Sequence, residues 1–148
     1  MYFEAVINFW EEDVDENTGE DVNVHVHKHV LCQAINYTDA EALATEYGSD
    51  ITVEDFDINP IKEMKIEDYH PLPGEPTDVP WFKCGCIYYD INEKGKRKAY
   101  KRAILVQSSD SKEAAARAKE LMNKWSHKDD CEVPNITKTK ITAILTPL

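Results

Sequence analysis

The fold is decided by a nine-residue stretch in the second half of the chain, Trp81-Phe82-Lys83-Cys84-Gly85-Cys86-Ile87-Tyr88-Tyr89. The chain opens with a stretch of the same shape, Tyr2-Phe3-Glu4-Ala5-Val6-Ile7-Asn8-Phe9-Trp10, in which aromatic residues again flank a charged residue and apolar residues. Both stretches are rich in aromatic and β-branched residues, which favours β-strands. The repetition predicts that the chain is built from two copies of one unit.

In both copies a glycine-containing turn and a returning strand follow the first strand. The first copy has an acidic hairpin tip at residues 11–21 and a returning strand at residues 22–34. The second copy has a basic tip around Gly95 and returns over residues 99–107. These segments predict one β-hairpin in each copy.

Each hairpin is followed by a helix. Two helix starts fit the first copy, with Asn36 or Thr38 as the N-cap, and Gly48 is the expected C-terminal stop. In the second copy Asp110 and Glu113 have the spacing of a capping box. Both helices carry an apolar stripe at helical spacing, so each is expected to cover a sheet.

A third strand completes each copy, at residues 51–66 and at residues 136–145. Pro60 lies within the first of these strands and cannot donate a hydrogen bond to a neighbouring strand. We therefore place Pro60 at a bulge, a bend or a sheet edge.

The predicted fold is α+β, with tandem duplicated β-β-α-β units at residues 1–70 and 81–148 and a linker with four prolines at residues 71–80. One such unit buries too little apolar surface to be stable on its own. Two arrangements remain open. The units can share one antiparallel sheet with two helices packed on one face, or they can form two layers.

The chain has 148 residues, of which 42% are hydrophobic and 30% charged, so it can bury a core as a globular protein. No apolar run approaches the roughly 20 residues of a membrane span, and the N-terminus lacks the pattern of a secretory leader. We therefore expect a soluble cytoplasmic protein with no membrane partner, whose four cysteines are free, mostly buried thiols.

Charge is distributed unevenly along the chain, whose net charge is −11. Residues 1–70 hold 18 acidic and 3 basic side chains, whereas residues 81–148 hold 8 acidic and 14 basic ones. Halves of opposite charge either attract each other or have different partners. Since the two copies differ most at their hairpins, we expect function there.

Three segments together resemble a known family. They are the strand start Trp81-Phe82-Lys83-Cys84, the segment at residues 105–114, and Lys138-Thr139-Lys140-Ile141 near the end. The chain is similar over nearly its whole length to a family of unknown function from gut bacteria and their tailed phages. The strongly acidic first half and the long proline linker depart from the pattern of this family. The resemblance implies no activity and no site residues, but it does imply a phage-encoded protein, in the cytoplasm of the host cell.

The acidic hairpin is the first candidate binding surface. A run of carboxylates attracts a basic protein surface, such as one that normally holds nucleic acid. The residues that we expect to contact a protein partner are Glu11, Glu12, Asp13, Asp15, Glu16 and Asp21. The simpler interpretation is a solvated charge run.

The second hairpin, residues 94–102, is an alternative site for nucleic acid. Cations beside aromatic rings can hold phosphates and stack bases. The residues of this candidate site are Lys94, Lys96, Arg97, Lys98, Tyr100, Lys101 and Arg102. The simpler interpretation is an exposed hairpin that offsets the acids of the first copy, and the net charge of −11 disfavours nonspecific DNA binding.

Histidines and cysteines give a third, weaker alternative. His25 and His27 lie two residues apart on a strand, where a pair of imidazoles can share a metal ion, although a solvated sheet face is the simpler interpretation. Cys84 and Cys86 occupy positions that are apolar in the first copy, which predicts core thiols. The sequence shows no phosphate-binding glycine loop and no nucleophile or metalloprotease motif, so we expect neither catalytic residues nor a cofactor.

These patterns favour a non-enzymatic binding protein that contacts another protein through its acidic surface. The resemblance adds a setting, a phage or mobile element in which such a protein modulates a host or defence protein. The alternatives are a nucleic-acid-binding accessory module using residues 94–102 and a small metal-binding protein or enzyme. Association of copies through sheet edges is a further expectation.

Overall fold

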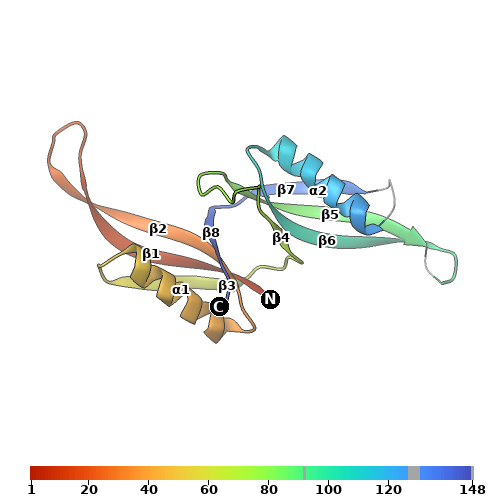
Figure 1. Ribbon diagram of the computed structural model, residues 1–148, viewed down its shortest axis with the longest axis horizontal. Helices are drawn as coiled ribbons and strands as arrows, with labels where there is room; N and C mark the ends of the chain where they lie inside the picture. Colours follow the sequence, from red (N-terminus) through yellow and green to blue (C-terminus); the bar gives the residue numbers. More distant parts are fainter. Residues whose placement is uncertain (92, 127–130, 148) are drawn as a thin grey trace. The chain divides into compact units, whose positions relative to one another are not determined.

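The computed structural model describes residues 1–91, 93–126 and 131–147, and it confirms the α+β class (Figure 1). Over these residues the chain forms two helices and eight strands. In chain order they are β1 (Tyr2–Val14), β2 (Asp21–Gln33), α1 (Tyr37–Ile51), β3 (Phe56–Glu63), β4 (Tyr69–His70), β5 (Trp81–Ile91), β6 (Arg97–Gln107), α2 (Ser111–Ser126), β7 (Glu132–Lys138) and β8 (Ile141–Leu145). Neither described helix is long and apolar enough to cross a membrane.

The elements form two compact units, each with a four-stranded sheet and one helix. Unit 1 consists of Met1–Met64 and Ile141–Leu148, with the strand order β3-β1-β2-β8 and helix α1. Unit 2 consists of Lys65–Lys140, with the order β4-β6-β5-β7 and helix α2. The pairs β2–β8 and β4–β6 are parallel, so the expectation of purely antiparallel sheets is wrong at these two pairs.

Each unit takes its parallel strand from outside its own β-β-α-β segment. The segment predicted as one strand at residues 51–66 contains only β3, and the chain then leaves unit 1 to form β4 in unit 2. Likewise the predicted strand at residues 136–145 is divided into β7 of unit 2 and β8 of unit 1. The compact units therefore differ from the contiguous segments 1–70 and 81–148 in where residues 65–70 and 141–148 belong.

The two units share their strand register. Tyr2 lies opposite Gln33 in unit 1, and Trp81 lies opposite Gln107 in unit 2. The next backbone amide then bonds the residue before the first strand, from Ala34 N to Met1 O at 3.0 Å and from Ser108 N to Pro80 O at 3.1 Å. Gln33 and Gln107 therefore hold equivalent positions at the ends of β2 and β6.

Helix α1 begins as predicted but ends later. Asn36 is confirmed as its N-cap, because its side chain accepts a hydrogen bond from Asp39 N at 2.9 Å, and Thr38 lies inside the helix. Gly48 does not end the helix, which continues to Ile51. A β-carbon at residue 48 would lie 2.5 Å from Cε2 of Phe56, so glycine is required here for close packing of the helix against the start of β3.

The hairpin of unit 1 also differs from its sequence-based description. Strand β1 continues to Val14 and β2 begins at Asp21, so the acidic tip comprises only residues 15–20 and the other acids lie on paired strands. Pairing with a facing strand satisfies the backbone without a core beneath it. Pro60 lies on the edge strand β3, opposite an irregularity in the register between Ala5 and Ile7, as predicted.

Candidate functional site

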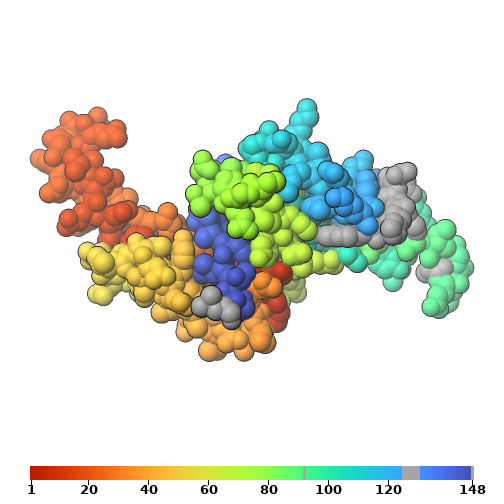
Figure 2. All heavy atoms as spheres, viewed as in Figure 1, coloured from red at the N-terminus to blue at the C-terminus, as the bar shows by residue number. Residues whose placement is uncertain are grey.

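The hairpin of unit 1 projects beyond the core of that unit as a two-stranded arm (Figures 1 and 2). Phe9 is the last buried residue of β1, and its cross-strand partner Val26 packs against the same core. From Trp10 onward every residue of β1 is exposed. We call residues 10–25 the acidic arm, because they include seven acidic side chains and neither lysine nor arginine.

Both faces of the acidic arm combine carboxylates with exposed apolar side chains. On the face that continues the core, Glu11 lies opposite Val24 and Asp13 lies opposite Val22. The other face carries Trp10, which is 58% exposed and stacks on the imidazole of His25 with ring centroids 4.6 Å apart. Exposed apolar groups bordered by charges are typical of protein-interaction surfaces rather than of merely solvated ribbons.

The carboxylate of Asp15 has a structural role at the tip of the arm. Its Oδ1 accepts a hydrogen bond from Asn17 N at 2.8 Å, and its backbone oxygen accepts one from Gly19 N at 2.7 Å. Gly19 has a φ of +72°, which favours glycine. Of the six acids predicted to bind a partner, Asp15 is therefore the one that also shapes the turn.

The predicted nucleic-acid residues lie on the hairpin of unit 2. On one face, Lys98 Nζ lies 5.3 Å from the ring centroid of Tyr100, which stacks on Tyr88 with centroids 5.2 Å apart. Arg102 Cζ lies 5.2 Å from the ring of Tyr88, so cation, ring, ring and cation follow one another. Lys94, Lys96 and Lys101 are exposed on the same hairpin.

This arrangement already occupies the aromatic rings. On the opposite face Arg97 Cζ lies 4.0 Å from the ring centroid of Tyr89. Arg102, on the first face, also forms an ion pair with Glu67 at 3.1 Å. Rings that contact neighbouring cations and one another have less open surface for stacking bases. The hairpin retains its positive charge toward phosphate but loses much of the predicted stacking capacity.

Three histidines on β2, His25, His27 and His29, each contact a neighbouring side chain. The rings of His25 and His27 have centroids 4.2 Å apart, and Nδ1 of His27 contacts Oδ1 of Asn8. His29 Nδ1 lies 3.6 Å from a carboxylate oxygen of Glu4. Within residues 1–91, 93–126 and 131–147, no group of three or more His, Cys, Asp or Glu side chains is placed to hold a metal ion.

All four thiols are free and buried, as the sequence predicted. Cys84 and Cys86 belong to the core of unit 2 beneath α2, and the Cys84 thiol points toward the carbonyl oxygen of Ala114 at 4.0 Å. Burial raises the pKa of Cys32 and Cys84 from 9.0 to about 11. Burial, with smaller contributions from neighbouring groups, raises the pKa of Cys86 to about 12. These thiols stay protonated and unreactive at neutral pH.

We expect the folded state to lose stability as the pH rises from 9 toward 11. In the unfolded chain thiols ionise near pH 9, whereas the buried thiols of the folded state ionise about two units higher. Their contribution is therefore complete below pH 9 and is lost above it. The measurement is the urea-derived free energy of unfolding at pH 8, 9, 10 and 11.

The Cys86→Ala variant is expected to show a shallower decline with pH than the natural protein. Ile104→Val, a core change without a thiol, serves as the control and should keep the natural slope. An unchanged slope in Cys86→Ala would contradict the assignment.

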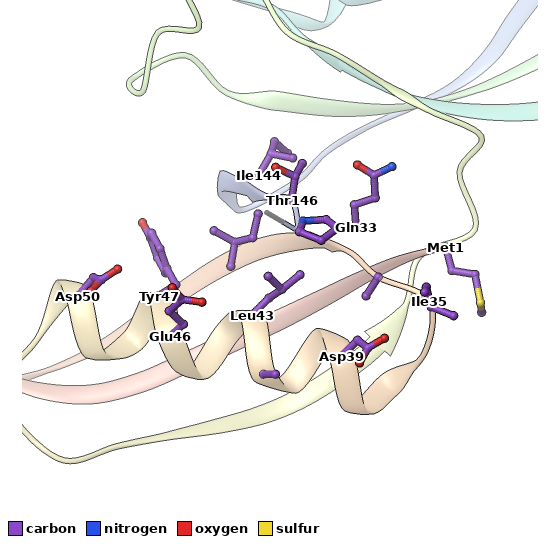
Figure 3. A pocket seen from close by; sticks show the side chains of 14 residues that line it. Met1, Gln33, Ile35, Asp39, Leu43, Glu46, Tyr47, Asp50, Ile144 and Thr146 are labelled. Carbon is purple, nitrogen blue, oxygen red and sulfur yellow. The ribbon is translucent and has the colours of Figure 1, made fainter.

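The structure also contains a groove in unit 1 that the sequence did not indicate. It lies between α1 and the end of β8, with a volume of about 970 Å³ (Figure 3). Its walls come from Met1, from residues between 33 and 50, and from residues 144–147. Because no local pattern indicates that β8 belongs to unit 1, the sequence could not predict that these walls lie together.

A family model described as "Domain of unknown function (DUF4494)" matches residues 1–147. No curated protein and no solved structure matches the chain.

Proposed function

The chain belongs to the DUF4494 family, and on the geometry of its two hairpins we propose that it is a non-enzymatic binding protein whose acidic arm docks on a basic protein surface. The setting that we propose is a phage or mobile element, in which the protein modulates a host or defence protein. The observation that carries the proposal is the acidic arm, a projecting ribbon whose exposed apolar side chains alternate with acids on both faces.

The acidic arm provides both electrostatic attraction and apolar contact area, the two contributions that stabilise a protein complex. Seven acidic side chains without a basic one attract a positive surface and speed association. Trp10, Val14 and Val24, which are 58%, 54% and 41% exposed, supply apolar area that becomes buried on contact. Aromatic residues are enriched among the residues that contribute most to binding energy, so Trp10 is the expected anchor.

The test is affinity capture from host lysate, followed by affinity measurement on each captured protein. The arm variant neutralises Glu11, Glu12, Asp13, Glu16 and Asp21 as amides and keeps Asp15, which shapes the turn. We expect it to lose at least about tenfold in affinity, which corresponds to about 1.4 kcal/mol. Trp10→Ala is expected to weaken the same complex.

A control variant changes net charge equally but away from the arm. It converts Glu41, Glu54, Asp55, Asp57 and Glu63, all exposed, to amides. If both variants lose the same partners, attraction depends on net charge alone and the arm is not the site. Partners that the arm variant retains would also contradict the proposal.

Nucleic-acid binding by residues 94–102 is the alternative proposal, and the cations gathered on the hairpin of unit 2 support it. Phosphate contacts by lysine and arginine make affinity fall steeply with salt. Titration with single-stranded and duplex oligonucleotides at two salt concentrations separates the alternatives. If the acidic arm alone binds a partner, no salt-sensitive binding of oligonucleotides is expected.

We also propose that the units descend from one duplicated β-β-α-β segment. Support comes from the equal positions of Gln33 and Gln107 and from equivalent caps, where Asp110 accepts a hydrogen bond from Glu113 N at 2.7 Å. Divergence of their hairpins would then have given one copy an acidic arm. Association of copies through the sheet edges remains a proposal.

A further inference from the structure

The groove of unit 1 has walls of contrasting character. Leu43 and Tyr47 from α1 and Ile144 from β8 supply apolar surface, and Gln33 lies at the end of β2 (Figure 3). Asp39, Glu46 and Asp50 add carboxylates along the helix, and no lysine or arginine is among the lining residues. None of the lining residues belongs to the acidic arm, so the groove is a separate surface.

At the equivalent place in unit 2, beside Gln107 at the end of β6, lies the proline-rich segment at residues 71–80. The side chain of Gln107, which is only 1% exposed, donates to Pro76 O at 2.6 Å and to Val79 O at 3.1 Å. Its Oε1 accepts from Leu72 N at 3.0 Å. The side-chain amide of Gln107 therefore forms three hydrogen bonds with the backbone of the proline-rich segment at residues 71–80.

A residue of α2 adds a further hydrogen bond to this segment. Arg117 of α2 donates to Pro71 O at 3.3 Å and also bonds the backbone oxygen of Gln107. Counted from the N-caps Asn36 and Asp110, the residue of α1 that corresponds to Arg117 is Leu43. Unit 1 thus keeps the glutamine but has an apolar residue where unit 2 has the arginine.

Gln33 has no such segment to hold. In the described part of the chain its side-chain amide has no hydrogen-bond partner, although it lies at the position of Gln107 and lines an open groove. An amide offers both a donor and an acceptor to the backbone of an extended peptide. A proline-containing peptide is pre-extended, so it loses little conformational entropy when it is bound.

From this correspondence we propose that the groove of unit 1 binds an extended, proline-containing segment of a partner protein that carries lysine or arginine. Gln33 bonds the peptide backbone as Gln107 does in unit 2, and the apolar wall at Leu43 and Tyr47 receives the prolines. The carboxylates of Glu46 and Asp50 select for basic side chains. The segment at residues 71–80 carries Glu75 and Asp78 instead. Its negative charge therefore disfavours binding of this segment in the groove of unit 1.

The probe is a synthetic peptide with the sequence of residues 71–80 in which lysines replace Glu75 and Asp78. It is titrated into the full-length protein and followed by fluorescence anisotropy and by two-dimensional NMR. We expect the lysine peptide to bind at least about tenfold more tightly than the natural sequence. The largest NMR shifts are expected at Gln33, Leu43 and Tyr47.

Variants then assign the contacts. Gln33→Ala and the pair Glu46→Gln with Asp50→Asn are each expected to weaken the lysine peptide at least about fivefold, and Leu43→Arg is expected to repel it. Glu41→Gln, an exposed change on α1 outside the groove, is the matched control and should leave the affinity unchanged. Thermal unfolding of each variant confirms that the fold is intact.

Several outcomes would overturn the inference. They are equal affinity for both peptides, full binding by Gln33→Ala, and NMR shifts confined to the acidic arm. If the protein self-associates in sedimentation experiments and this association displaces the peptide, the occupant of the groove is a second copy of the chain instead. Failure of the acidic-arm test alone leaves these outcomes unaffected, because the two surfaces share no residue.

Discussion

Deleting residues 141–148 is expected to destabilise unit 1 strongly, although these residues are the most distant in sequence from its first strand. Strand β8 pairs with β2 over Val30, Leu31 and Cys32, whose side chains are completely buried. The deletion removes Ile141, which is 3% exposed, and Ala143 and Leu145, which pack against the core of unit 1. At roughly 1.5–3 kcal/mol for each large apolar side chain, the loss is on the order of 4 kcal/mol. A whole domain is stable by only about 5–15 kcal/mol.

Urea unfolding and amide hydrogen exchange measure this effect. Exchange at residues 28–33 is expected to lose its protection, because β2 becomes an edge strand with unpaired backbone groups. A deletion that begins at Thr146, after β8, is the control and should keep the stability of unit 1. A protein without residues 141–148 that retains full protection at β2 would show that β8 does not stabilise unit 1.

The second large effect is expected from Gln107→Ala, which should cost roughly 2–4 kcal/mol. The substitution leaves the backbone groups of Leu72, Pro76 and Val79 without their partner beside a buried position. We also expect residues 71–80 to become cleavable by a protease, since three of the hydrogen bonds that hold this segment are lost.

Gln33→Ala is the matched control for this experiment. The two glutamines hold equivalent positions, but the Gln33 side chain has no hydrogen-bond partner in the described part of the chain, so we expect a change below about 0.5 kcal/mol. Both variants are compared by urea unfolding and limited proteolysis. Equal losses at the two positions would mean that the hydrogen bonds of Gln107 to residues 71–80 do not account for its contribution to stability.

Local signals made much of the fold predictable. Alternation in the opening strands identified the core positions, including Cys84 and Cys86, because side chains on a strand alternate between its faces. Asp110 identified the start of α2, and the start of α1 was narrowed to Asn36 or Thr38, since a cap leaves a short, local signature. These features depend on neighbours within a few residues, which a sequence displays directly.

Other features depend on contacts that no local pattern encodes. The run at residues 136–145 is uniformly rich in β-formers, so nothing marks where it leaves one sheet for the other. Gly48 suggested a helix end, but its absent side chain makes room for Phe56, a contact between helix and strand. The acids of the arm were visible from composition, whereas the exposure of Trp10 followed only from the length of the hairpin.

The exchange of parallel strands has a consequence for synthesis on the ribosome. Unit 2 is complete when Lys140 has been made, whereas unit 1 must wait for β8. At roughly 5–20 residues per second, the interval between residues 64 and 141 is about 4 to 15 s. During that time the first-made unit has an open edge at β2, which is a site for pairing with other nascent chains. The half of the protein that is translated first is therefore the half that closes last.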